Sequence, residues 1–291
     1  MPPPTRSLAD WVEYLSNTEI PVLRHTLRQL HTAREDIDRI NAHDISAIVL
    51  HDPMMTVRVM SYIHPLGGQR LHGEITTIRG AVAMLGIHPF FNRFENAQTV
   101  ENTLNAHPDA LLGLLHVVRR AQRAASYAYD WALWRHDIDL EEVSIAALLH
   151  DLAETLLWCF APEAMLDIQR LQQTDAKLRS ISAQQTILGF PIQDLQIALC
   201  QTWKLPALLR TLIDDQHAEN PRVLNVKLAV DLARHSAHGW SDAALPDDFA
   251  AIEKLLSMSH ETLLQHLGLL KHDEQHPPTT DDSGGISTGS E

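Results

Sequence analysis

An all-α fold is the class that this sequence predicts, and three observations lead to it. Glycine is scarce, at 12 of 291 residues, whereas leucine and alanine are abundant. Leucine and alanine lose little freedom in a helix, and glycine loses the most. Apolar residues recur at spacings of three and four, as on one buried helical face. No run of residues alternates strongly enough to predict a strand.

Helices are predicted along the first third of the chain from apolar spacing and end signals. Proline fits the first turn of a helix, and Pro53 separates two helical runs. Thr77 is a suitable N-cap, and Gly86 fits a C-terminal stop. The predicted helices are Leu8–Leu15, a longer helix opened by Pro21, Asp44–Leu50, Met54–Ile63, Ile78–Leu85 and a segment opened by Pro89.

The remaining helices follow from the same signals. Asp139–Trp158 is hydrophobic nearly all round, so we expect it at the centre of the fold. From His272 the composition changes to Pro, Thr, Ser, Gly and Asp, which predicts a disordered tail. The other predicted helices are Asp109–Trp134, Glu163–Gln172, Leu178–Leu188, Gln193–Thr202, Pro206–His217, Pro221–His235, Phe249–Leu256 and His260–Leu267.

Composition narrows the class of partner and the compartment. The net charge of −14, from 37 acidic and 23 basic side chains, argues against a nucleic-acid partner. We interpret the short basic cluster of Arg119, Arg120 and Arg123 as a solvated helix face. Cys159 and Cys200 lie in apolar runs outside any C-x-x-C pattern, which fits a reducing compartment. We therefore expect a cytoplasmic protein without a membrane segment or a signal peptide.

One pair among the 18 histidines differs from the rest. His150 and Asp151 are adjacent inside the most apolar predicted helix. Burying both groups costs several kcal/mol unless they are paired, hydrogen-bonded or bound to a metal. Both side chains can ligate a divalent transition ion. A polar pair that pins helix packing and a pair that binds a metal both agree with these residues.

The stretch ALLHDLAETLL, residues 147–157, resembles the core motif of the HD phosphohydrolase superfamily. In that superfamily an earlier His and a later Asp join the His-Asp pair around metal. The resemblance implies a ligand set of His116, His150, Asp151 and Asp231. It implies a single divalent ion, such as iron, manganese, zinc or magnesium, as the cofactor, and it assigns no separate catalytic residue.

Other segments resemble the HDOD branch of this superfamily. A helix ends in Asp52-Pro53, and residues 74–86 are similar to an Ile-Thr-Ser-Ile stretch that leads to a Leu-Gly. Trp203-Lys204-Leu205-Pro206 resembles the Trp-x-Leu-Pro of that branch. The resemblance covers about Ile20 to His235. We expect an N-terminal helical half, residues 8–105, packed on an HD-like helical half, residues 106–270, in one continuous unit. Outside it, residues 1–7 and 271–291 are expected to be flexible.

The chain also departs from the metal-binding pattern. Ile192 and Gln216 stand where HDOD proteins often carry histidines. Glu154 stands where the catalytic HD-GYP branch has a Lys, and no Gly-Tyr-Pro motif occurs. A bimetallic site and an HD-GYP activity are therefore not expected.

The resemblance implies a bacterial regulatory module that contacts a signalling protein and lacks efficient catalysis. Fold-level likeness is a weak warrant for function, so two alternatives stay open. One is a metal-dependent phosphohydrolase with a mononuclear His/Asp site. The other is a sensor that binds a nucleotide without hydrolysing it. The oligomeric state does not follow from the sequence.

Overall fold

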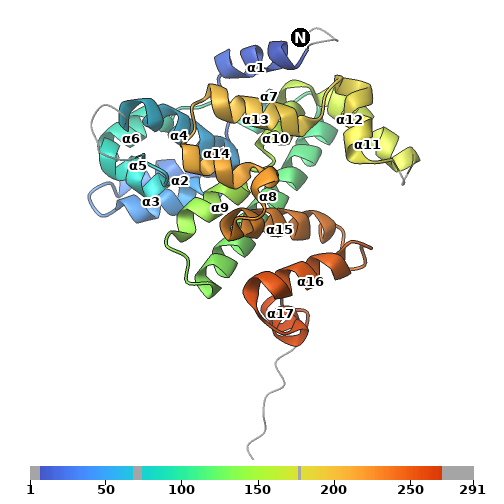
Figure 1. Cartoon of the computed structure of the whole chain (residues 1–291). Helices are drawn as coiled ribbons and strands as arrows, with labels where there is room; N and C mark the ends of the chain where they lie inside the picture. Colours follow the sequence, from blue (N-terminus) through green and yellow to red (C-terminus); the bar gives the residue numbers. More distant parts are fainter. Residues whose placement is uncertain (1–6, 68–73, 176–177, 271–291) are drawn as a thin grey trace, which may run out of the picture.

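The computed structural model describes residues 7–67, 74–175 and 178–270, and its ordered elements are helices (Figure 1). The predicted all-α class is confirmed. The tail predicted at 271–291, and the N-terminus before Ser7, lie outside the described residues. The helices are α1 Leu8–Asn17, α2 Arg24–Glu35, α3 Ala42–Val49, α4 Pro53–Gly67, α5 Ile78–Leu85, α6 Ile87–Phe94, α7 Val100–Thr103, α8 Pro108–Trp134, α9 Leu140–Leu149, α10 Leu152–Phe160, α11 Pro162–Thr174, α12 Ser180–Leu188, α13 Ile192–Thr202, α14 Ala207–Ile213, the 3₁₀ turn η1 Asp215–His217, α15 Pro221–His235, α16 Leu245–Leu256 and α17 His260–His266.

Most helices of the first half, among them α1, α3, α5 and α7, begin where a side chain accepts hydrogen bonds from free backbone N–H groups. Thr77 caps α5 by accepting a hydrogen bond from the Gly80 N–H at 3.1 Å, as predicted. Asp52 lies just before α4 and is fully buried. Its carboxylate accepts hydrogen bonds from the N–H groups of Met54 at 2.9 Å, Met55 at 3.1 Å and Leu23 at 2.8 Å. Asp52 therefore joins the start of α4 to the segment before α2.

The helix predicted to open at Pro21 begins at Arg24 instead. Val22 is extended and forms a parallel bridge with Thr99. The Val22 N–H donates to Gln98 O at 2.9 Å, and the Val100 N–H donates to Val22 O at 2.9 Å. Because these bonds use both backbone groups of Val22, the helix starts two residues later. The bridge places the segment before α2 beside the segment before α7.

The second half is organised around α8, the longest helix. It packs against α9, α10, α11 and α15. In Figure 1, α8 and α9 cross the middle of the molecule, α11 and α12 extend at one side, and α16 and α17 lie at the end beyond α15. The predicted boundaries of α8 and α15 agree closely with the structure. The segment predicted as one helix at Pro206–His217 is divided into α14 and η1.

The single helix predicted over Asp139–Trp158 is wrong. The chain forms α9 and α10, separated by a turn at His150 and Asp151. The expectation that this segment is central is correct, since residues of α9 and α10 such as Ile145, Leu149 and Leu156 are completely buried. The break turns a continuous core helix into two helices that present a polar pair between them.

The same segment, Leu140–Phe160, has the length and apolar composition of a membrane span. However, 78% of its most apolar window is buried inside the structure. The core helix of a soluble protein meets the same test, so this segment is weak grounds for a membrane span.

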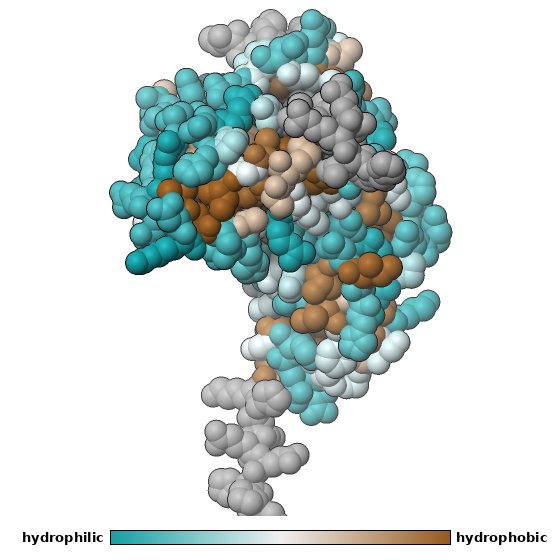
Figure 2. Space-filling model, turned by 90° about the vertical axis from the view of Figure 1, so that its left-hand side faces the viewer, coloured by the Kyte–Doolittle hydropathy of each residue, from teal (hydrophilic) through white to brown (hydrophobic). Residues whose placement is uncertain are grey.

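One apolar core runs through both halves, from Trp11 in α1 to Leu263 in α17. Polar contacts also cross between the halves at the start of α9. Glu141 accepts a hydrogen bond from the Arg79 N–H at 3.1 Å, and Glu142 accepts one from the Thr76 hydroxyl at 2.6 Å. The face of the molecule drawn in Figure 2 is mostly hydrophilic, and its hydrophobic residues gather in two areas.

Candidate functional site

The break between α9 and α10 is filled by the side chain of Gln196 from α13. In a continuous helix the Ala153 N–H would donate to Leu149 O. Here the Ala153 N–H donates to Gln196 Oε1 at 2.7 Å, and Gln196 Nε2 donates to Leu149 O at 2.9 Å. A side chain inserted into the ladder in this way is a recognised cause of a helix kink. Gln196 is 1% exposed, so both backbone groups are satisfied inside the core.

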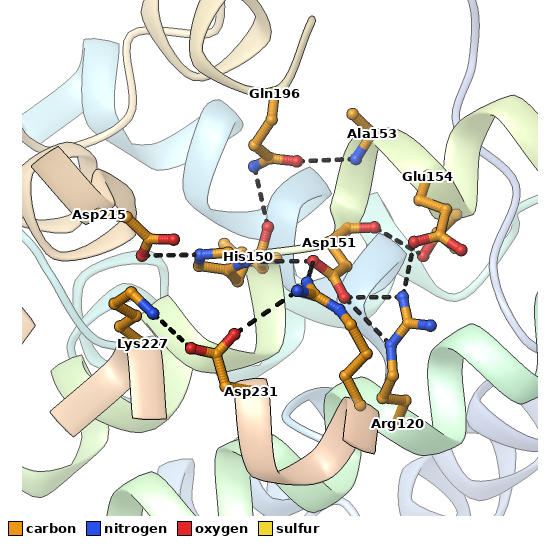
Figure 3. A network of polar contacts seen from close by, with 12 residues as sticks. Arg120, His150, Asp151, Ala153, Glu154, Gln196, Asp215, Lys227 and Asp231 are labelled. Carbon is orange, nitrogen blue, oxygen red and sulfur yellow. Dashed lines mark hydrogen bonds and ion pairs between the residues drawn. The ribbon is translucent and has the colours of Figure 1, made fainter. Parts of the chain in front are cut away.

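His150 lies at this break and contacts two carboxylates (Figure 3). Its Nδ1 is 3.1 Å from Asp151 Oδ1, and its Nε2 is 3.2 Å from Asp215 Oδ1 in η1. Burial disfavours the charged imidazolium, but the hydrogen bonds to Asp151 and Asp215 outweigh it and raise the pKa of His150 to about 9. The raised pKa favours the imidazolium, the form in which both ring nitrogens can donate to these carboxylates.

Asp151 is held by two arginines in addition to His150. Arg120 of α8 donates from Nε and Nη2 to Asp151 Oδ2, at 3.1 and 2.7 Å. Arg234 of α15 donates from Nη2 to Asp151 Oδ1 at 3.3 Å. Burial raises the pKa of Asp151, but the charges of Arg120 and Arg234 and the contact with His150 outweigh it and hold that pKa well below the usual value. Asp151 is thus ionised and its two oxygen atoms are both occupied.

Each arginine has a further carboxylate partner. Arg120 Nη2 donates to Glu154 Oε2 at 2.6 Å (Figure 3). Arg234 Nη1 lies 3.5 Å from Asp231 Oδ1, and Asp231 also pairs with Lys227 one turn earlier on α15. We call Arg120, His150, Asp151, Asp215 and Arg234 the His–Asp network. It ties α8, the α9–α10 turn, η1 and α15 to one another.

The structure brings together part of the predicted ligand set. His150 and Asp151 are in direct contact, as expected for neighbours at a turn. Asp231 is connected to Asp151 through the guanidinium of Arg234 and pairs with Lys227. His116 is exposed on α8 and lines a cavity with Arg120 and Glu154. None of the described contacts joins His116 to His150 or Asp151.

The HD-type resemblance implies a metal, and the donor atoms in this arrangement do not fit one. A metal-binding histidine needs a ring nitrogen whose lone pair faces the ion, whereas the two His150 nitrogens lie 3.1 and 3.2 Å from carboxylate oxygens of Asp151 and Asp215. Two guanidinium groups supply the positive charge beside Asp151. Within residues 7–67, 74–175 and 178–270, no group of three or more His, Cys, Asp or Glu side chains could hold an ion. Metal binding itself stays a prediction.

The network includes residues that the sequence reasoning missed. Arg120 was interpreted as part of a solvated helix face, and this is wrong, since its side chain is 17% exposed and pairs with Asp151 and Glu154. Asp215, Arg234 and Gln196 were not considered. A glutamine within the apolar run of α13 was the one available signal, because a buried amide requires partners.

Comparisons with known proteins agree with this fold. The HDOD domain model matches residues 20–219. The structure is similar to the MmoQ response regulator from Methylococcus capsulatus str. Bath, with a TM-score of 0.67 and 16% identity over 88% of this chain and 100% of that one. It is also similar to a virulence factor from Campylobacter jejuni subsp. jejuni, with a TM-score of 0.63 and 19% identity over 92% and 93%.

These structural likenesses, at such low identity, show the fold. No curated protein matches the chain. The family match covers more than half of the sequence and confirms the resemblance found from Asp52-Pro53, residues 74–86 and Trp203–Pro206. This chain belongs to the HDOD family.

Proposed function

We propose that this protein is a regulatory HDOD module of bacterial signal transduction, which acts by contacting another protein and has no efficient catalytic activity. One observation carries the proposal. Both ring nitrogens of His150 and both carboxylate oxygens of Asp151, the atoms that could ligate a metal, already contact a carboxylate, a guanidinium or each other. A hydrolytic metal centre needs ligands with free lone pairs and an open coordination position. The arrangement supports a structural role for the pair instead.

The His–Asp network supports this role because its members come from four separate elements. Its positive groups are compensated by Asp151, Asp215 and the flanking Glu154 and Asp231, which is the condition under which buried ions are tolerated. Such a network fixes the angle between α8, α9, α10 and α15 while leaving the outer surface of the module free for a partner. The fold shared with a protein described as a response regulator is consistent with signalling.

The first test is the metal content of the purified protein, measured by mass spectrometry beside an Asp151→Ala variant. We expect far less than one equivalent of iron, manganese, zinc or magnesium in both. We also expect no hydrolysis of phosphodiesters or cyclic dinucleotides when these metals are added. About one equivalent of metal, lost in the variant and accompanied by metal-dependent turnover, would establish the mononuclear phosphohydrolase alternative.

The second test concerns the partner. A protein captured by cross-linking should be purified and titrated against this chain by calorimetry. We expect a defined stoichiometry, retained by a His150→Gln variant at a temperature at which that variant is folded. Retention is expected because the proposed contact needs the fold rather than chemistry at His150. Loss of binding in the folded variant would contradict a purely structural role for the pair.

A further inference from the structure

A cavity of about 560 Å³ lies beside the His–Asp network and shares Arg120 and Glu154 with it. Its volume falls in the range of roughly 300–1,000 Å³ that is usual for small-molecule sites. The walls come from α8, α10, α11, α12, α13 and α15. This cavity is separate from the atoms of His150 and Asp151, neither of which lines it.

The charged groups around the cavity are mainly basic, although the protein as a whole is acidic. Arg119, Arg120 and Arg123 line it with a single carboxylate, Glu154. Glu154 and Asp151 already compensate Arg120. Among the described residues Arg119 has no ion-pair partner, and Arg123 donates to neutral oxygen atoms, namely the Tyr127 hydroxyl at 3.0 Å and the Ser236 hydroxyl at 3.1 Å.

Two histidines, His116 and His238, complete this basic side of the cavity. Arg119 and Arg123, on adjacent turns of α8, thus give this cavity two guanidinium groups without an ion-pair partner among the described residues, although the chain has a net charge of −14. Guanidinium groups bind phosphate oxygens through paired, charge-assisted hydrogen bonds. This side of the cavity is therefore suited to a phosphate group.

The other walls suit the rest of a larger ligand. Four apolar side chains from α8, α10 and α11, each 3–5% exposed, present their edges as one wall against which a flat ring can lie. Among the side-chain amides, Gln172 donates to the Ser180 hydroxyl and Gln184 accepts from the Ile192 N–H, which leaves Gln169 and Gln173 without a described partner to serve as donors and acceptors. Inorganic phosphate would use neither feature. The apolar residues are Val117, Trp158, Met165 and Ile168, and the amides are Gln169, Gln172, Gln173 and Gln184.

We propose that this cavity binds a nucleotide, with its phosphate at Arg119 and Arg123 and its base between the apolar wall and the glutamine amides. The proposal does not depend on the partner contact proposed above. Arg120 also lines the cavity, but its guanidinium is paired with Asp151 and Glu154, so the phosphate is assigned to Arg119 and Arg123.

The test uses the full chain and a panel of purine and pyrimidine mono- and dinucleotides, with inorganic phosphate and pyrophosphate at the same ionic strength. Binding is measured by calorimetry and by thermal shift. We expect saturable binding of at least one nucleotide. Arg119→Gln and Arg123→Gln should each weaken it about tenfold, through the lost charge-assisted bonds.

Arg28→Gln is the matched control, because Arg28 is an exposed arginine on α2 away from this cavity. Arg119→Gln keeps the test valid if Arg123→Gln is unstable, since Arg119 is exposed and makes no described contact. The proposal is overturned if no nucleotide binds, or if phosphate or pyrophosphate binds as tightly as any nucleotide. It is also overturned if Arg28→Gln weakens binding as much as Arg119→Gln. None of these results depends on metal content or on a partner protein.

Discussion

At the scale of single residues, the site depends on which groups carry protons. His150 is charged because two carboxylates face its two nitrogens, and Asp151 is ionised because two guanidinium groups and an imidazolium surround it. The sequence showed that His150 and Asp151 are adjacent in an apolar run. It could not show their partners, because Arg120 and Arg234 are 31 and 83 residues from Asp151 and reach it through tertiary packing.

The raised pKa of His150 predicts a loss of stability at alkaline pH. A folded-state pKa of about 9, above the unfolded value of 6.5, means that the imidazolium stabilises the fold fully below about pH 6.5. This stabilisation is lost as the pH rises through about 9. Its size is on the order of 3 kcal/mol, at about 1.36 kcal/mol per pKa unit.

Urea unfolding of the wild type and of a His150→Gln variant, from pH 6 to 10, measures this contribution. We expect the difference in unfolding free energy to be largest near pH 6 and to shrink toward pH 10. His25→Gln, an exposed histidine on α2, serves as the control and should change stability little at any pH. A pH-independent difference for His150→Gln would show that the ring acts through packing and not through its charge.

At the scale of helices, the sequence predicted helix ends such as those of α5 correctly, but it did not predict the break between α9 and α10. Thr77 and Gly86 bound α5 as predicted, because caps are local and act within a few residues. The division into α9 and α10 depends on Gln196, which lies 43 residues after Ala153. Apolar periodicity continues through His150 and Asp151, so nothing local marks the interruption. The start of α2 was predicted too early, at Pro21, because the neighbouring Val22 bonds to Gln98, a residue far along the sequence.

Replacing Gln196 with leucine should destabilise the protein by about 3 kcal/mol. The change removes the partners of Leu149 O and the Ala153 N–H inside the core, and each unsatisfied buried group costs roughly 1–3 kcal/mol. Chemical unfolding followed by circular dichroism measures the loss. Gln201→Leu, at an exposed position on the same helix, is the matched control. Equal stability of the two variants would mean that α9 and α10 close into one helix without Gln196.

At the scale of the whole molecule, the two predicted halves share one core and meet at the start of α9. Glu142 binds Thr76 from the first half and Arg222 of α15 from the second, at 2.6 and 2.9 Å. The all-α class and the family could be predicted because composition and short motifs carry them. The contacts that join the halves, such as those of Glu142 with Thr76 and Arg222, could not be predicted, because they link segments far apart in the sequence.

These shared contacts predict that residues 8–105 and 106–270 unfold together. Scanning calorimetry should give one transition in which the calorimetric and van't Hoff enthalpies agree. Native-state hydrogen exchange should show similar protection in α4 and α9, because both contribute to the common core. Two separate transitions, one of them confined to the first half, would instead show that the halves are independent domains.

The bridge between Val22 and Thr99 has a consequence for how this chain can be rearranged. Its two backbone bonds hold Val22 beside residues 98–100, with about the spacing of neighbouring strands, so the segment from α2 to α6 begins and ends at adjacent points. A segment whose ends adjoin can be excised and spliced into another host, or its gene order permuted, without stretching the joints. The segment between Val22 and Val100 therefore suits a circular permutation, since its two ends adjoin, whereas its removal would expose the core that it shares with the second half.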